Sequence, residues 1–237
     1  MGVDVIVIDP EYEYKDLSDA VGGTYVNISL NSDSKINPFD LPKPEDGESS
    51  STGDIIRSAV ITMKGLLRIM IGEVSHAEDS VLDRALLETY AKKDITPDTD
   101  LNNSKIEFPL MSDLQDVLHS MEGGDELAQK LDKYTNGTFA GLLNYPTNVD
   151  VNNQLVVFSV RDLEDELRPM AIYTVINYIW NKVRSKLKKR IDTILLDIKN
   201  QVNDNVPGYC RINKIIEQTE PFEKTPTKKV KRYLYLN

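Results

Sequence analysis

The chain has 237 residues and a formal net charge of −10, with 28% charged and 40% hydrophobic residues. This balance is typical of a soluble globular protein with one large domain or two small ones, and it excludes a chain that stays disordered. The acidic total also excludes a protein whose whole surface is built to wrap nucleic acid.

The first predicted element is a strand over residues 3–8, a run of Val and Ile with a single acid. Such a run fits a strand of a parallel sheet that is covered on both faces. Pro10 lacks an N–H group, so the strand should stop near Asp9. Ligands of open α/β sheets bind just past the carboxyl ends of the strands, which makes Asp9, Glu11 and Glu13 candidate site residues. The alternative is a buried strand followed by a solvated acidic turn.

A short helix over residues 15–21 and a strand over residues 24–29 complete a βαβ unit, whose two strands should be parallel. The pair Gly22 and Gly23 stops the helix. Residues 31–52 are polar and contain three prolines, which predicts a long and mobile loop.

Four amphipathic helices follow without an intervening strand, which predicts an all-helical insertion in an α/β domain. Apolar residues recur at helical spacing over residues 54–71, 76–92, 112–119 and 125–134, and the third helix is capped by its first two residues. We interpret these apolar stripes as ordinary core faces.

Residues 154–160 predict a further strand. The longest predicted helix follows, with Pro169 in its first turn and its end at Lys189. The end of this helix is strongly basic. The helix dipole favours cations there, and contact with phosphate or nucleic acid is the alternative explanation. Beyond it we expect a separate helix over residues 192–203 and a strand over residues 211–218.

Cysteine and histidine usage excludes further kinds of site. Cys210 is the only cysteine, so no intramolecular disulfide forms, and a reducing cytoplasmic compartment is the simplest expectation. The two histidines, His76 and His119, lie in unrelated segments, so we expect no metal site. No apolar run approaches the roughly 20 residues that span a bilayer, and the N-terminus lacks the pattern of an export signal.

Five segments form a specific pattern in order and spacing: VIDPEYEY (7–14), KINPFD (35–40), PLMSDL (109–114), YTNGTFAG (134–141) and VVFSV (156–160). The first follows V-I-D-P-x-x-E-Y. With this pattern, residues 3 to about 190 resemble the TraC-type conjugal transfer ATPases, the large motor subunits of type IV secretion systems.

The resemblance implies an α/β fold, a partial RecA-like P-loop NTPase sheet with an all-helical insertion. Residues 1–52 would be the first βαβ part, residues 53–150 the insertion, and residues 151–190 the strand and long helix. The family also implies ATP and Mg²⁺ as ligands, a homo-oligomeric motor at a membrane channel, and other secretion or conjugation subunits as partners.

The sequence departs from this family at two motifs. It contains no G-x-x-x-x-G-K-[ST], the loop whose N–H groups and lysine hold the phosphates of a nucleotide. Where the family has an apolar strand that ends in Asp-Glu, Asp197 is followed by Ile198. We therefore interpret Asp9, Glu11 and Glu13 as remnants of a nucleotide site in a chain that does not hydrolyse ATP on its own.

Residues 191–237 carry a second pattern: IKNQVN (198–203), VPGY (206–209) and PFEKTPTKKVKRY (221–233). It resembles the last segment of AMP-forming long-chain acyl-CoA synthetases, in which the lysine at the position of Lys229 contacts the acyl-adenylate. The chain would then join two unrelated fragments near residues 189–192 and end in a small α+β tail. A solvated basic tail is the alternative interpretation.

The sequence leaves three functions open. The first is a fragment of a TraC-type ATPase, cytoplasmic or at the inner face of the cell membrane, that reaches the membrane only through partners and binds no nucleic acid sequence-specifically. The second is an ATPase subunit completed by another chain that supplies the phosphate loop. The third is the C-terminal fragment of an AMP-forming ligase, with Lys229 as its catalytic residue.

Overall fold

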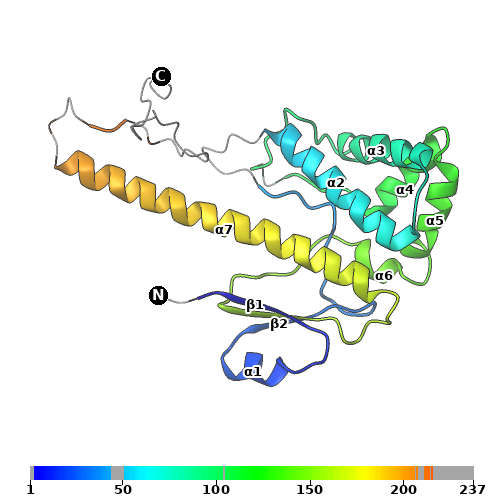
Figure 1. Cartoon of the computed structure of the whole chain (residues 1–237), viewed down its shortest axis with the longest axis horizontal. Coiled ribbons are helices and arrows are strands. Elements are labelled where there is room, and N and C mark those ends of the chain that lie inside the picture. The colour runs from blue at the N-terminus through cyan, green and yellow to red at the C-terminus, as the bar shows by residue number, and fades with distance from the viewer. Residues whose placement is uncertain are drawn as a thin grey trace, which may run out of the picture. The chain divides into compact units, whose positions relative to one another are not determined.

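A computed structural model describes residues 3–43, 51–103, 105–205, 207, 211–213 and 215 of the chain. The chain divides into two compact units, residues 1–186 and residues 187–237, and the boundary falls within helix α7 (Arg168–Asp204). The first unit holds a parallel sheet and a group of helices (Figure 1).

Three strands form the sheet in the order β1-β3-β2: β1 (Val5–Asp9), β2 (Thr24–Asn27) and β3 (Leu155–Ser159). All pairings are parallel, as the βαβ pattern predicts. However, β1 and β2 are not neighbours, because β3 lies between them. The central strand is the most buried, with the side chains of Val156, Val157 and Phe158 fully enclosed.

Strand β1 is less covered than its sequence predicts. Val5 is 46% exposed, and along β1 only Asp9 is buried. The prediction that both faces are covered is therefore wrong. The reason is that β1 lies at one edge of the described sheet, while α1 (Lys15–Ala20) packs on β2 and β3.

The sheet has helices on both faces, with α1 on one side and α7 on the other (Figure 1). The ring of Tyr178 on α7 meets the ring of Phe158 edge-on, at 6.3 Å between centroids. On the α1 side, a Cβ atom at Gly23 would lie 3.0 Å from the carbonyl oxygen of Leu155. Glycine at this turn therefore allows β2 to start close against β3.

All four helices of the predicted insertion are present: α2 (Thr52–Ile71), α3 (His76–Ala91), α4 (Met111–Ser120) and α5 (Asp125–Thr135). A short helix that the sequence did not predict, α6 (Ala140–Leu143), comes after them. Capping boxes at Ser51 and Ser75 fix the first turns of α2 and α3. Helix α4 begins earlier than predicted, because the Asp113 carboxylate accepts a hydrogen bond from the backbone N–H of Leu110.

The loop after β2 enters the core. Phe39 is fully buried, and its ring lies 5.8 Å from that of Tyr90, whose hydroxyl donates to the Phe39 carbonyl at 3.1 Å. Ile36 and Leu41 are also buried. The prediction of a mobile loop is therefore wrong for residues 31–43, because apolar side chains anchor this segment. Residues 44–50 lie outside the described residues.

Helix α7 is one helix from Arg168 to Asp204, not two helices separated near residue 190. No Pro or Gly occurs between Pro169 and Asp204, so nothing interrupts the backbone hydrogen bonds. The basic run from Lys182 onward thus lies in the middle of the helix, and a C-terminal dipole does not explain it. Of the predicted strand over residues 211–218, the described residues 211–213 and 215 have no regular structure, and the others lie outside the described residues.

Replacing Phe39 by Ala should destabilise the protein by about 3–5 kcal/mol, because it leaves a cavity beside Tyr90. Urea unfolding followed by circular dichroism measures this change. Ile61→Ala is the matched control, since Ile61 is 72% exposed and should cost little. Equal losses for the two variants would contradict the anchoring role of the loop.

Candidate functional site

The three strands end at one level, which creates a common edge. The register pairs Ser159 with both Asp9 and Asn27, so the carboxyl ends of all three strands coincide. The three site residues predicted from the first strand, Asp9, Glu11 and Glu13, lie at this edge. Ligands of open α/β sheets bind at such edges.

Asp9 organises the loop that follows β1. Its carboxylate is buried and accepts three backbone hydrogen bonds, from Glu11 at 3.2 Å, Glu13 at 3.1 Å and Tyr14 at 3.0 Å. Burial alone would raise the pKa of this carboxyl, but the backbone donors outweigh it and lower the pKa below its ordinary value. Asp9 is thus an ionised anchor for the loop, and its oxygens are already engaged.

The anchored loop presents Glu11 and Glu13 to solvent and holds Tyr12 in an uncommon backbone conformation. Both glutamates are exposed. Tyr12 has φ of 68°, in the left-handed region that side-chain-bearing residues seldom adopt. Its ring meets that of Tyr25 edge-on at 5.8 Å, and the guanidinium of Arg161 lies 5.4 Å from its centroid. Backbone strain of this kind concentrates at functional sites.

The structure adds residues from β2 and β3 that were not predicted from the sequence. Arg161 and Asp162 closely follow β3, just as Glu11 and Glu13 follow β1. Their position just after a predicted strand was the sequence signal that could have identified them. The amide of Asn27 donates to the Asp162 carboxylate at 2.9 Å. Nearby, burial raises the pKa of the Tyr25 hydroxyl. The edge therefore combines carboxylates, one guanidinium and aromatic rings.

The residues at this edge have side chains that can contact a ligand. Exposed carboxylates can hold hydrated Mg²⁺ or orient water, and aromatic rings can pack on a base. Among the residues that the structure describes, no group of three or more His, Cys, Asp or Glu side chains is arranged to hold a metal ion.

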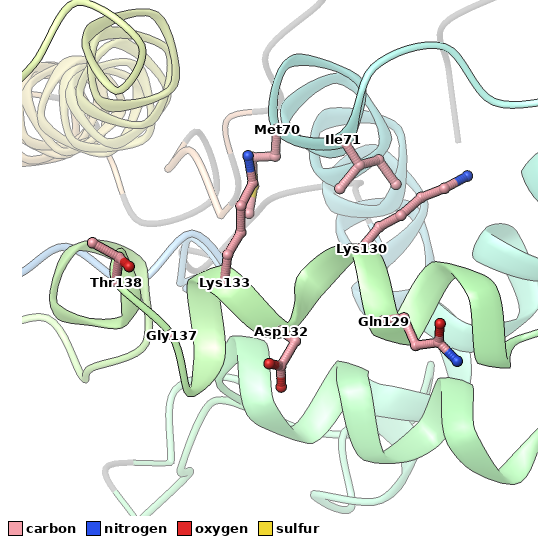
Figure 2. Close-up of a pocket in the computed structure, with 8 residues that line it drawn as sticks. All are labelled: Met70, Ile71, Gln129, Lys130, Asp132, Lys133, Gly137 and Thr138. Carbon is pink, nitrogen blue, oxygen red and sulfur yellow. The ribbon is translucent and has the colours of Figure 1, made fainter.

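A hollow in the helical insertion is a separate feature, between the end of α2, helix α5 and Thr138 (Figure 2). It is open to solvent and has a volume of about 530 Å³. Its two lysines are already engaged: Lys130 pairs with Glu78 at 2.8 Å, and Lys133 pairs with Glu166 at 3.1 Å. Figure 2 shows Asp132 pointing away from Met70 and Ile71. We interpret this hollow as a packing feature, because its charges stabilise neighbouring helices.

Three of the segments that carry the family resemblance meet inside the first unit. The ammonium of Lys35, which lies in KINPFD, donates a hydrogen bond at 2.6 Å to the carbonyl of Gly141, which lies in YTNGTFAG. The Asn37 amide donates to the carbonyl of Pro109 at 2.9 Å, in PLMSDL. Only glycine fits at position 141, since the Cβ atom of any other residue would lie 2.4 Å from the carbonyl oxygen of Leu30. These contacts therefore join the helical insertion to the loop after β2.

Lys229, the candidate catalytic residue of the ligase-like segment, lies outside the described residues, as do most of the residues from 206 onward. Within the described ranges, no helix combines the length and hydropathy that crossing a membrane requires.

No family model and no curated protein matches the chain. Thirteen chains of solved structures do match. One is VirB4 of Thermoanaerobacter pseudethanolicus, with a TM-score of 0.67 and 25% sequence identity over 77% of this chain and 49% of the VirB4 chain. The chain thus has the fold of part of VirB4 and spans about half of its length. This match supports the resemblance of residues 3–190 and gives no support to the acyl-CoA synthetase pattern.

Replacing Asp9 by Asn should destabilise the fold by about 1–3 kcal/mol at neutral pH, because the amide cannot accept all three backbone hydrogen bonds. The folded-state pKa of Asp9 lies below its ordinary value. Its stabilising effect is therefore present at neutral pH and is lost as the pH falls through that lowered pKa. Urea unfolding at about pH 7 and at about pH 3 should show the difference between wild type and Asp9→Asn shrinking. A difference that grows with acidity would contradict this role.

Proposed function

We propose that this chain is part of a type IV secretion ATPase of the TraC and VirB4 kind, which holds part of a RecA-like sheet together with the helical insertion. The observation that carries the proposal is the similarity to VirB4 over 77% of the chain. The five segments VIDPEYEY, KINPFD, PLMSDL, YTNGTFAG and VVFSV support it independently.

In this proposal the edge formed by Asp9, Glu13 and Arg161 is one wall of the nucleotide site. ATP would supply the phosphoryl group when bound, with Mg²⁺ to neutralise its charge. Glu13, the acid of the V-I-D-P-x-x-E-Y pattern, would orient water there. Asp9 would act as a positioning residue, because its carboxylate fixes the backbone N–H groups on both sides of Tyr12. Arg161, which follows the adjacent strand, would place a positive charge at the same edge.

The chain would then work only as part of a larger assembly. The sequence lacks the phosphate loop, so we expect no ATP hydrolysis by this chain. The partners would be further secretion or conjugation subunits, including copies of the same motor protein. They would place the chain on the cytoplasmic side of the cell membrane, without a membrane contact of its own.

The second candidate is a subunit that becomes active when another chain completes its site. The exposed position of Glu11 and Glu13 favours it, because two carboxylates remain accessible to an incoming phosphate loop. The two candidates predict different results when such a chain is added. The first predicts no ATP turnover, and the second predicts turnover that depends on Glu13.

Purified chain should show no ATP turnover in a phosphate-release assay and no saturable heat of ATP binding in calorimetry, because phosphate contacts supply most of the affinity. Adding a TraC-type chain with an intact phosphate loop then separates the candidates. If turnover appears, Glu13→Gln should lower it by about 10²-fold or more, whereas Glu122→Gln, at an exposed residue between α4 and α5, should leave it unchanged. Turnover by the purified chain alone would overturn the first proposal.

A further inference from the structure

The ring of Tyr12 is the movable part of an otherwise fixed loop. The carboxylate of Asp9 accepts hydrogen bonds from backbone N–H groups on both sides of Tyr12. These bonds hold the backbone of Tyr12 at a φ of 68°, a conformation that persists only where the surrounding structure fixes it. The side chain is 46% exposed. It can therefore rotate while the backbone that carries it stays in place.

Two contacts keep the Tyr12 ring where it is. Its ring meets that of Tyr25 edge-on, and the guanidinium of Arg161 lies over it. Ring–ring and cation–ring contacts are each weak at a site that is open to solvent. Removing Arg161 would therefore let the ring turn outward.

Tyr25 and Asn27 hold unused polar atoms on the side of the sheet that Tyr12 covers. Val26 pairs with Phe158, which faces α7, so the residues on either side of Val26 point to the other face. The Tyr25 hydroxyl and the Asn27 amide oxygen are enclosed, and neither makes a hydrogen bond within the described part of the chain. Enclosed polar atoms without partners are rare, because each loses its hydration without compensation. Two of them on one strand point to a site that is closed in this conformation.

Arg161 is free to exchange the Tyr12 ring for another partner. Its side chain is exposed, and among the residues that the structure describes no carboxylate forms an ion pair with it. Arg168 donates to the backbone carbonyl of Arg161 at 3.2 Å and to that of Leu163 at 2.9 Å, which fixes the backbone there and leaves the guanidinium mobile. A guanidinium binds phosphate through paired, charged hydrogen bonds that are stronger than its contact with an exposed ring. A phosphate group at this edge would therefore draw Arg161 away from Tyr12.

We propose that Tyr12 is a lid over the Tyr25 hydroxyl and the Asn27 amide oxygen, held closed by Arg161 and opened when Arg161 binds the phosphate group of a ligand. With the lid open, the Tyr25 hydroxyl donates to that phosphate, and the Asn27 oxygen accepts from a hydroxyl or amino group of the ligand. Burial raises the pKa of Tyr25, so its hydroxyl keeps its proton at neutral pH. The lid depends on this geometry alone, whereas its assignment to a nucleotide phosphate rests on the proposed function.

Hydroxyl-radical footprinting read by mass spectrometry measures the exposure of each tyrosine. In the wild-type chain, Tyr25 should be labelled more slowly than Tyr145, which is 49% exposed and lies outside the lid. Arg161→Gln should raise the labelling of Tyr25 severalfold and leave Tyr145 unchanged. Arg84→Gln, at an exposed arginine of α3, is the matched control and should change neither. Unchanged labelling of Tyr25 in Arg161→Gln would overturn the lid.

Tyr12→Gly tests whether Arg161 acts through the Tyr12 ring. The substitution removes the ring and suits the positive φ, so Tyr25 should be labelled severalfold faster in a chain that circular dichroism shows to be folded. Adding Arg161→Gln to Tyr12→Gly should then raise the labelling of Tyr25 no further. An equal increase with and without the Tyr12 ring would show that Arg161 shields Tyr25 directly and would overturn the lid.

Inorganic phosphate tests the trigger. Sodium phosphate, compared with sodium chloride at the same ionic strength, should raise the labelling of Tyr25 relative to Tyr145 in the wild-type chain and not in Arg161→Gln. A rise in both chains, or in neither, would overturn the role of Arg161. AMP at the same concentration should give a larger rise than phosphate, and a smaller one would overturn the nucleotide assignment while supporting the lid. None of these results depends on ATP turnover, so the lid and the proposed function can fail separately.

Discussion

The buried side chain of Asn37 is the constraint on which the first unit depends. Its amide donates to the carbonyl of Pro109 at 2.9 Å, and its side-chain oxygen accepts from the backbone N–H of Phe39 at 3.1 Å. Its own backbone N–H donates to the hydroxyl of Thr147 at 2.7 Å. A buried amide without such partners would cost several kcal/mol. One residue thus fixes the loop after β2 to the segments that precede α4 and β3.

Packing contacts of this kind explain why the family resemblance is strong although the phosphate-loop motif is absent from the sequence. Lys35, Asn37 and Gly141 belong to segments that agree with the TraC-type pattern, and each serves packing between the helical insertion and the sheet. The chain that these contacts hold together has the fold of part of VirB4. Similarity in these segments therefore supports the architecture.

At the carboxyl edge of the sheet, one residue fixes the loop after β1. Asp9 is buried with its oxygens engaged, so it holds the loop that brings Glu13 to the surface and Tyr12 into its left-handed conformation. Helix α7 buries Val175 and Tyr178 in the core and exposes Trp180.

The local elements could be predicted from the sequence alone, because β-branched runs, helical spacing and capping residues act over a few neighbours. Pro10 correctly ended β1, and the four insertion helices lie where their apolar spacing predicts. Tertiary structure was needed to show that β3 lies between β1 and β2, that Phe39 is buried and that Arg161 joins Asp9 at one edge. Those outcomes depend on contacts between residues far apart in the chain, which no local pattern encodes.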